Sequence, residues 1–128
     1  MSKQAQVLDA LRLLIDAQGS FAAVTIGALP TENGLWLAVS TGRVSETTLA
    51  YGNMVALDVA LNAKHDQQST ALETLCALHE ALTSVAGLPV GEGWQMIAIR
   101  TNGAPGYLGR EGGQWLYGSG LTVEYTTE

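Results

Sequence analysis

A strand pattern that changes directly into a helical pattern lies in the middle of the chain. From residue 54 to residue 62, the apolar side chains of Val55, Leu57, Val59 and Leu61 occupy every second position. This period of two predicts a strand with one apolar face over about 53–62. After a polar join, apolar side chains recur at spacings of three and four residues, which predicts an amphipathic helix over about 66–85. A strand, a polar join and a long helix therefore have to pack around the same core.

Length and composition limit how this core is built. The 128 residues predict a single domain, 1–128, because the chain is long enough for one core and too short for two. Hydrophobic residues make up 47% and charged residues 14% of the chain, which excludes an intrinsically disordered protein. So few surface charges favour a surface that is partly covered by copies of the same chain or by partners. A weakly charged monomer is the open alternative.

The charge pattern argues against nucleic-acid binding. The net charge is −6, and the six Lys and Arg residues are scattered singly, with no basic stripe to neutralise phosphates. The lone cysteine, Cys76, cannot form an internal disulfide and fits a reducing cytoplasm. The N-terminus has no apolar signal core, and no stretch approaches membrane-spanning length. We therefore expect a soluble protein that is made inside the cell.

The N-terminal part predicts a helix followed by a hairpin. Ser2 can cap a first helix, and Gly19 ends it. Strands over 21–29 and 35–41 are expected to form a hairpin around Asn33-Gly34, a pair that tolerates positive φ. Residues 42–52 have no clear period and predict a long exposed loop or a hairpin extension.

The C-terminal part predicts strands only. Residues 87–93 form a connector, 94–101 a strand, and 114–117 with 121–126 the last strand or strands. The segment 118–120, Gly-Ser-Gly, is expected to be a bulge or a bend in the last strand. The whole order, α-β-β-β-α-β-β, predicts an α+β fold with two helices packed on one face of a mainly antiparallel sheet.

Residues that could carry chemistry are few. Cys76 and His79 are three apart on the second helix among leucines, so a packing role is expected rather than a thiolate–imidazole pair. His65 is expected to have a polar role at the start of that helix, with Asp66 or Ser69 as the cap. Two histidines and one cysteine fall short of a closed zinc site.

The glycine-rich run 103–113 does not bind phosphate, according to its sequence. It contains no Walker-type lysine, and its residues 109–113 predict a hairpin tip. The aromatic residues Tyr107, Trp115, Tyr117 and Tyr125 lack the basic neighbours that nucleic-acid stacking requires. Burial on one sheet face or use as interface anchors is expected instead. We therefore predict no enzyme, no catalytic residue, no cofactor and no metal.

The region from about Asn53 to Tyr125 resembles the minor capsid proteins of long-tailed phages and prophages. In these proteins a strand with a polar end runs into a helix, and a later strand leads through a Pro-Tyr-like turn to a final Trp-x-Tyr-Gly-Ser hairpin. The matching positions are Asn62, Lys64, His65, Gln67 or Gln68, Pro105, Tyr107, Trp115, Tyr117, Gly118 and Ser119. Gly106 separates the proline from the tyrosine, which is a small departure from the pattern.

The resemblance implies a tail-terminator, or tail-completion, protein. Such a protein forms a ring, typically a hexamer, that caps the finished tail tube, ends its growth and offers a docking face to the head. The implied partners are further copies of the chain, the tail-tube protein and the head-completion or connector protein. The implied location is the virion, after assembly in the host bacterial cytoplasm, with no membrane partner. DNA that passes through the ring would not be bound specifically.

Two other functions stay open at this stage. A head-completion or neck connector protein shares the small, ring-forming character. A small-molecule-binding or enzymatic α+β domain would need a pocket with convergent polar groups, for which His65, Arg100 and Cys76 are the candidates.

Ring or tube contacts are expected from the segments 42–52 and 103–113, and from edge strands whose unpaired backbone groups can receive a neighbour. Arg100 could pair with an acidic residue of its own chain or of a neighbouring copy. Glu46 in a ring lumen would repel DNA phosphates, although solubility explains the acidic charge equally well. The candidate interface residues are Arg43, Glu46, Thr48, Arg100, Arg110 and Glu111.

Overall fold

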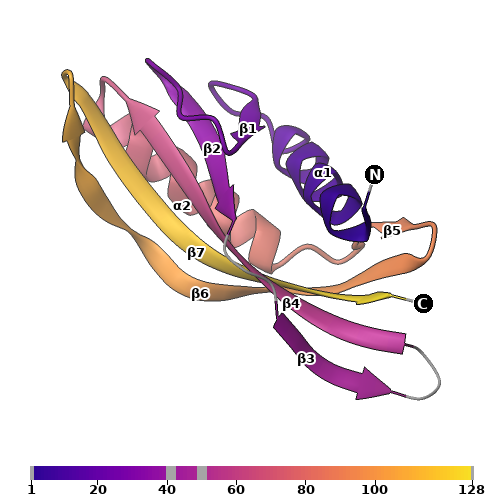
Figure 1. The fold of residues 1–128 in the computed structure, drawn as a ribbon. Coiled ribbons are helices and arrows are strands. Elements are labelled where there is room, and N and C mark those ends of the chain that lie inside the picture. The colour runs from indigo at the N-terminus through magenta and orange to yellow at the C-terminus, as the bar shows by residue number, and fades with distance from the viewer. Residues whose placement is uncertain (1, 40–42, 49–51, 128) are drawn as a thin grey trace.

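The computed structural model describes residues 2–39, 43–48 and 52–127 of the chain. Within these residues, seven strands form a sheet in the order β1-β2-β4-β7-β6-β5, and β3 pairs with β4 outside this path (Figure 1). The elements are α1 (Lys3–Asp16), β1 (Val24–Ile26), β2 (Gly34–Val39), β3 (Arg43–Thr48), β4 (Gly52–His65), α2 (Gln68–Thr83), β5 (Val90–Gly91), β6 (Trp94–Glu111) and β7 (Gln114–Thr127). The fold is α+β, as the sequence predicts.

Both helices cover the face of the sheet that carries the alternating apolar side chains. Leu57, Val59, Leu61 and Ala63 of β4 belong to the same buried cluster as the inner residues of α1 and α2. Every second residue of β7 from Tyr117 to Tyr125 is buried as well. The period-two pattern of β4 therefore identifies the core face correctly.

The first helix is confirmed in detail. The Ser2 side chain accepts a hydrogen bond of 3.1 Å from the backbone N–H of Ala5 and caps the helix. Val7, Leu11 and Ile15 are its buried residues. Gly19 follows the helix with a φ of 73°, a conformation that residues with a side chain rarely adopt.

The predicted hairpin between 21–29 and 35–41 is wrong, because β1 is short and runs parallel to β2. Val24 pairs with Leu35 and Ile26 pairs with Leu37. After β1 the chain turns at Gly27, whose φ is 76°, and returns to the beginning of β1 before β2 starts. The antiparallel partner of β2 is β4. The Asn33-Gly34 pair thus belongs to a connection between parallel strands.

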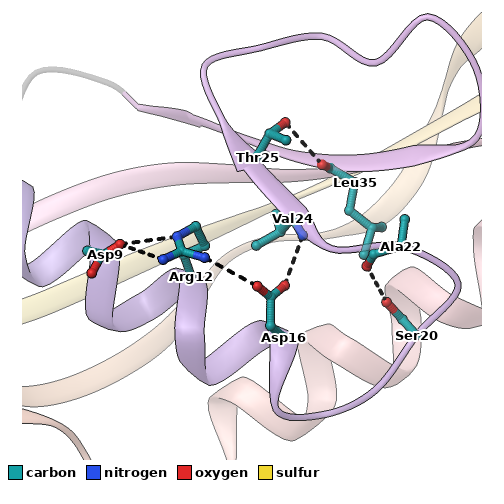
Figure 2. A network of polar contacts seen from close by, with 8 residues as sticks. All are labelled: Asp9, Arg12, Asp16, Ser20, Ala22, Val24, Thr25 and Leu35. Atoms are coloured by element: carbon teal, nitrogen blue, oxygen red, sulfur yellow. Dashed lines mark hydrogen bonds and ion pairs between the residues drawn. The ribbon is translucent and has the colours of Figure 1, made fainter.

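Polar contacts hold β1 against α1 (Figure 2). Asp16 accepts a hydrogen bond of 2.9 Å from the backbone N–H of Val24 and also pairs with Arg12, at 3.4 Å. The hydroxyl of Thr25 donates to the carbonyl of Ala28 over 2.8 Å. These contacts fix β1 beside the C-terminal end of α1.

The segment 42–52 is a hairpin extension where it is described. Residues 43–48 form β3, which pairs with β4 from Arg43↔Ala56 to Thr48↔Gly52. Residues 42 and 49–51 lie outside the described part of the chain. At the other end of β4, neither Asp66 nor Ser69 caps α2, because the N-cap is Gln67 and makes no side-chain capping bond. His65 Nδ1 instead accepts a hydrogen bond of 3.0 Å from the Gln67 N–H, in agreement with the polar role expected of His65.

The last two strands form a long hairpin that turns at Gly112-Gly113, where both φ values are positive. The hairpin tip is confirmed, but β6 continues to Glu111 instead of ending near Thr101. The expected bulge at 118–120 is wrong, since β7 pairs with β4 without a register shift from Asn53↔Thr127 to His65↔Trp115. The register shifts against β7 lie in β6 instead. A strand paired on both sides cannot take an extra residue as easily as a strand whose outer side is open.

The packing expected of Cys76 is wrong, whereas that of His79 is confirmed. The buried residues of α2 are Ala71, Leu75, Leu78, His79 and Leu82, and Cys76 is exposed. None of the helices in the described residues is long and apolar enough to span a membrane.

Candidate assembly interface

The six candidate interface residues do not form one site. Arg43, Glu46 and Thr48 lie on β3, which pairs with the first residues of β4. Arg110 and Glu111 lie at the end of the β6–β7 hairpin. In the strand register, Arg110 lies opposite Trp115, and Trp115 lies opposite His65, the last residue of β4. The two segments therefore occupy opposite ends of the longest part of the sheet (Figure 1).

Arg100 forms an ion pair within its own chain. Its Nε donates a hydrogen bond to Oε1 of Glu124, which lies on the neighbouring strand β7. Ala56 pairs in register both with Glu124 and with Arg43, so this ion pair lies beside the β3–β4 pairing. An exposed pair of this kind contributes little to stability.

Glu111 holds the end of the β6–β7 hairpin against β4. Its carboxylate lies 3.6 Å from the ammonium of Lys64, whose side chain is 3% exposed. The same ammonium donates a hydrogen bond of 3.2 Å to the carbonyl of Pro30. A buried ammonium requires such partners, because its desolvation is otherwise costly. Glu111 is thus already engaged within the chain.

Arg110 belongs to a cluster that we call the hairpin patch, made of Tyr107, Arg110 and Trp115. The guanidinium carbon of Arg110 lies 4.2 Å from the ring centroid of Trp115, and the Tyr107 ring lies 6.0 Å from that of Trp115. Tyr107 is 56% exposed, whereas the neighbouring Tyr117 is buried and accepts a hydrogen bond from Gln68. Aromatic residues and arginine dominate the binding energy of many interfaces. The expected interface role of the aromatics therefore applies best to Tyr107.

A second surface lies on α2 beside the C-terminal end of α1. It is a groove of about 330 Å³, which we call the α2 groove, and its lining includes small side chains such as Ala77 and Ala81. Glu73 stands at its rim and is exposed. The lining residues are Gln18, Gly19, Ser20, Glu73, Thr74, Ala77, Leu78 and Ala81. Sequence reasoning missed this groove, although the spacing of Glu73, Ala77 and Ala81 on one side of a helix could have indicated it.

The residues proposed for an enzymatic alternative are not brought together. In the strand register, Arg100 of β6 lies opposite Thr122 of β7, and Thr122 lies opposite Asp58 of β4. Asp58 is seven residues away from His65 along β4. Seven strand residues span about 23 Å. Cys76 is on the exposed side of α2. Within the described ranges, no group of three or more His, Cys, Asp or Glu residues could hold a metal ion.

His79 is a buried titratable group in the helix–sheet interface. Its Nε2 hydrogen-bonds the Thr101 hydroxyl at 2.8 Å, and its buried Nδ1 has no partner among the described residues. Burial lowers the pKa of His79 below its usual value, because the imidazolium would lose its hydration. The side chain is therefore neutral at pH 7.

Lowering the pH should destabilise the protein through His79. The unfolded chain binds a proton at about pH 6.5, whereas the folded chain binds it only at lower pH. The unfolded state then carries more protons, so stability decreases as the pH falls below about 6.5. Urea unfolding at pH 7.5 and pH 5.5 should show a larger loss for the wild type than for the non-titrating variant His79→Gln. Equal losses in the two proteins would contradict a neutral, buried His79.

These features define an α+β protein with an open sheet, an exposed hairpin patch and a groove on α2. No protein family model matches the sequence, and no curated protein matches it. Among solved structures, the fold resembles a chain from the virion of a native gene transfer agent particle, with a TM-score of 0.52 and 18% sequence identity. The alignment covers 97% of this chain and 90% of the other chain. At this identity, the likeness establishes a shared fold over nearly the full length of both chains.

Proposed function

We propose that this protein is a structural component of a phage-like virion and acts as its tail terminator. Copies of the chain form a ring, a hexamer in the typical case, that caps the tail tube and offers the head-docking face. The observation that carries this proposal is the fold likeness to a chain of a gene transfer agent virion, which extends over 97% of this chain. The resemblance of residues 53–125 to phage minor capsid proteins supports the same conclusion.

The shape of the sheet supports assembly into a ring. A closed ring of identical subunits requires two different surfaces on each copy. Surfaces suited to this are separated in the protein, with β3 at one end of β4 and the hairpin patch at the other. The outer side of β6 beyond Met96 pairs with no strand in the described part of the chain and offers backbone groups to a neighbour.

Tail-tube subunits from the same genome provide the direct test. They are polymerised with the purified protein, and the tube ends are imaged by negative stain. Rings on tubes of fixed length are expected. Tubes of unrestrained length with bare ends would contradict the terminator role and favour the head-completion or neck connector role.

Reversing the charge of Arg43 or Arg110 should impair capping. Each Arg→Glu variant is expected to leave the monomer folded, and the Arg110 side chain is exposed. The fraction of capped tube ends should fall, with an unchanged circular dichroism spectrum. Lys3→Glu is the matched control, because it has the same change in charge on α1. If both arginine variants cap tubes as well as the control does, these two segments do not make ring or tube contacts.

A further inference from the structure

We propose that, in the ring, the hairpin patch of one copy sits in the α2 groove of the next copy, with Arg110 paired to Glu73. This inference rests on the proposed function and names the subunit contact that the ring would use. The occupant of the groove is thus a second copy of this chain.

Arg110 is a cation that forms no ion pair with a carboxylate among the described residues. Among the described side chains, Arg12 pairs with Asp9 and Asp16, Lys64 with Glu111, and Arg100 with Glu124. Lys3 donates to the carbonyl of Glu92. Arg110 instead lies over the ring of Trp115, next to the exposed ring of Tyr107. Its guanidinium is therefore oriented by an aromatic platform and open to a carboxylate from outside.

The α2 groove has the complementary properties. Glu73 is exposed at its rim and forms no ion pair with a described cation. One turn further along α2, Ala77 leaves room in the groove that a large side chain such as Tyr107 can fill. An aromatic side chain in an apolar depression with a charge pair at its rim is the usual form of an energetic centre in an interface.

The two surfaces lie on opposite flanks of α2. Gln68 and His79 face the hairpin, since they contact Tyr117 of β7 and Thr101 of β6. Thr74 and Ala81 face residues 18–20 on the other flank. At 100° per residue, the residues of one pair are separated from those of the other by roughly 120–160° around the helix axis. The patch and the groove of one copy therefore face away from each other, and their contact between copies is head-to-tail, the type that can close a ring.

Disulfide cross-linking between two differently substituted proteins tests this contact. Both carry Cys76→Ser, one carries Tyr107→Cys, and the other carries Ala77→Cys. They are mixed under mild oxidation, and covalent dimers are counted on a non-reducing gel. A heterodimer is expected from the mixture, and no homodimer from either protein alone. Leu13→Cys, at a 55% exposed position of α1, replaces Ala77→Cys as the control and should give no product.

Charge exchange supplies the second part of the test. Adding Arg110→Glu to the first protein should lower the heterodimer yield about tenfold, because two carboxylates then face each other. Adding Glu73→Arg to the second protein should restore it. A missing heterodimer, a product equal to that of the control, or an unrestored yield would each overturn the contact.

The two proposals fail separately. Capped tubes without the heterodimer would leave the terminator role intact and refute the patch-in-groove contact. The heterodimer with bare tube ends would establish the contact between copies and refute the terminator role.

Discussion

Replacing Trp94 by alanine is expected to lower the free energy of unfolding by about 3–5 kcal/mol. Trp94 is the first residue of β6 and is 7% exposed. It links this strand to α1, because its indole N–H donates a hydrogen bond of 3.0 Å to Gln6. A side chain at Gly91 would overlap the indole, so β5 also packs directly against the ring. The truncation removes a large apolar surface, leaves a cavity and removes the hydrogen bond from the indole N–H to Gln6 at the same time.

Urea unfolding measures this loss, and two variants separate its causes. Trp94→Phe keeps most of the apolar ring and removes the N–H, so it should cost less than the alanine variant. Ile97→Ala, at a 42% exposed position of the same strand, should change stability by less than about 0.5 kcal/mol. A Trp94→Ala loss as small as that of Ile97→Ala would mean that α1 is not held by this side chain.

The elements that follow from local pattern could be predicted from the sequence. The period of two in β4, the helical spacing in α2 and the Ser2 cap of α1 depend on residues that are neighbours in the chain. The parallel pairing of β1 with β2 could not be predicted, because Asn33-Gly34 indicates a turn but does not specify which strand follows as partner. The length of β6 was underestimated because glycines in its second half resemble a loop, whereas the open outer side of the strand accommodates register shifts there.

The candidate interface could likewise be predicted from the sequence only where it depends on neighbouring residues in the chain. The sequence identifies Arg110 and Glu111 as charged residues at a hairpin tip, but it cannot show that only Glu111 meets a buried lysine. Lys64 lies in β4 on the face opposite to Leu61 and Ala63. No residue next to it in the sequence indicates that its side chain is buried. The α2 groove combines residues 18–20 with residues 73–81, so it exists only after the chain has folded.

Leu61→Ala is expected to cost about 2–5 kcal/mol of unfolding free energy. Leu61 is fully buried on the core face of β4, where it pairs in register with Leu37 of β2 and with Ser119 of β7. Strands on both sides and the helices above limit how far the site can collapse, which favours the upper part of this range. Chemical unfolding at neutral pH gives the value.

The matched control for Leu61→Ala is Leu13→Ala, the same truncation at a 55% exposed position of α1. The control should lose less than about 1 kcal/mol, because little apolar surface is transferred to water. Leu61→Ala should also cap tubes normally at temperatures where it is folded, since its side chain reaches no surface. Arg110→Glu should show the reverse, with near-native stability and impaired capping. A Leu61→Ala protein that is folded but fails to cap tubes would mean that stability and assembly depend on the same residues, against the separation of core and interface argued above.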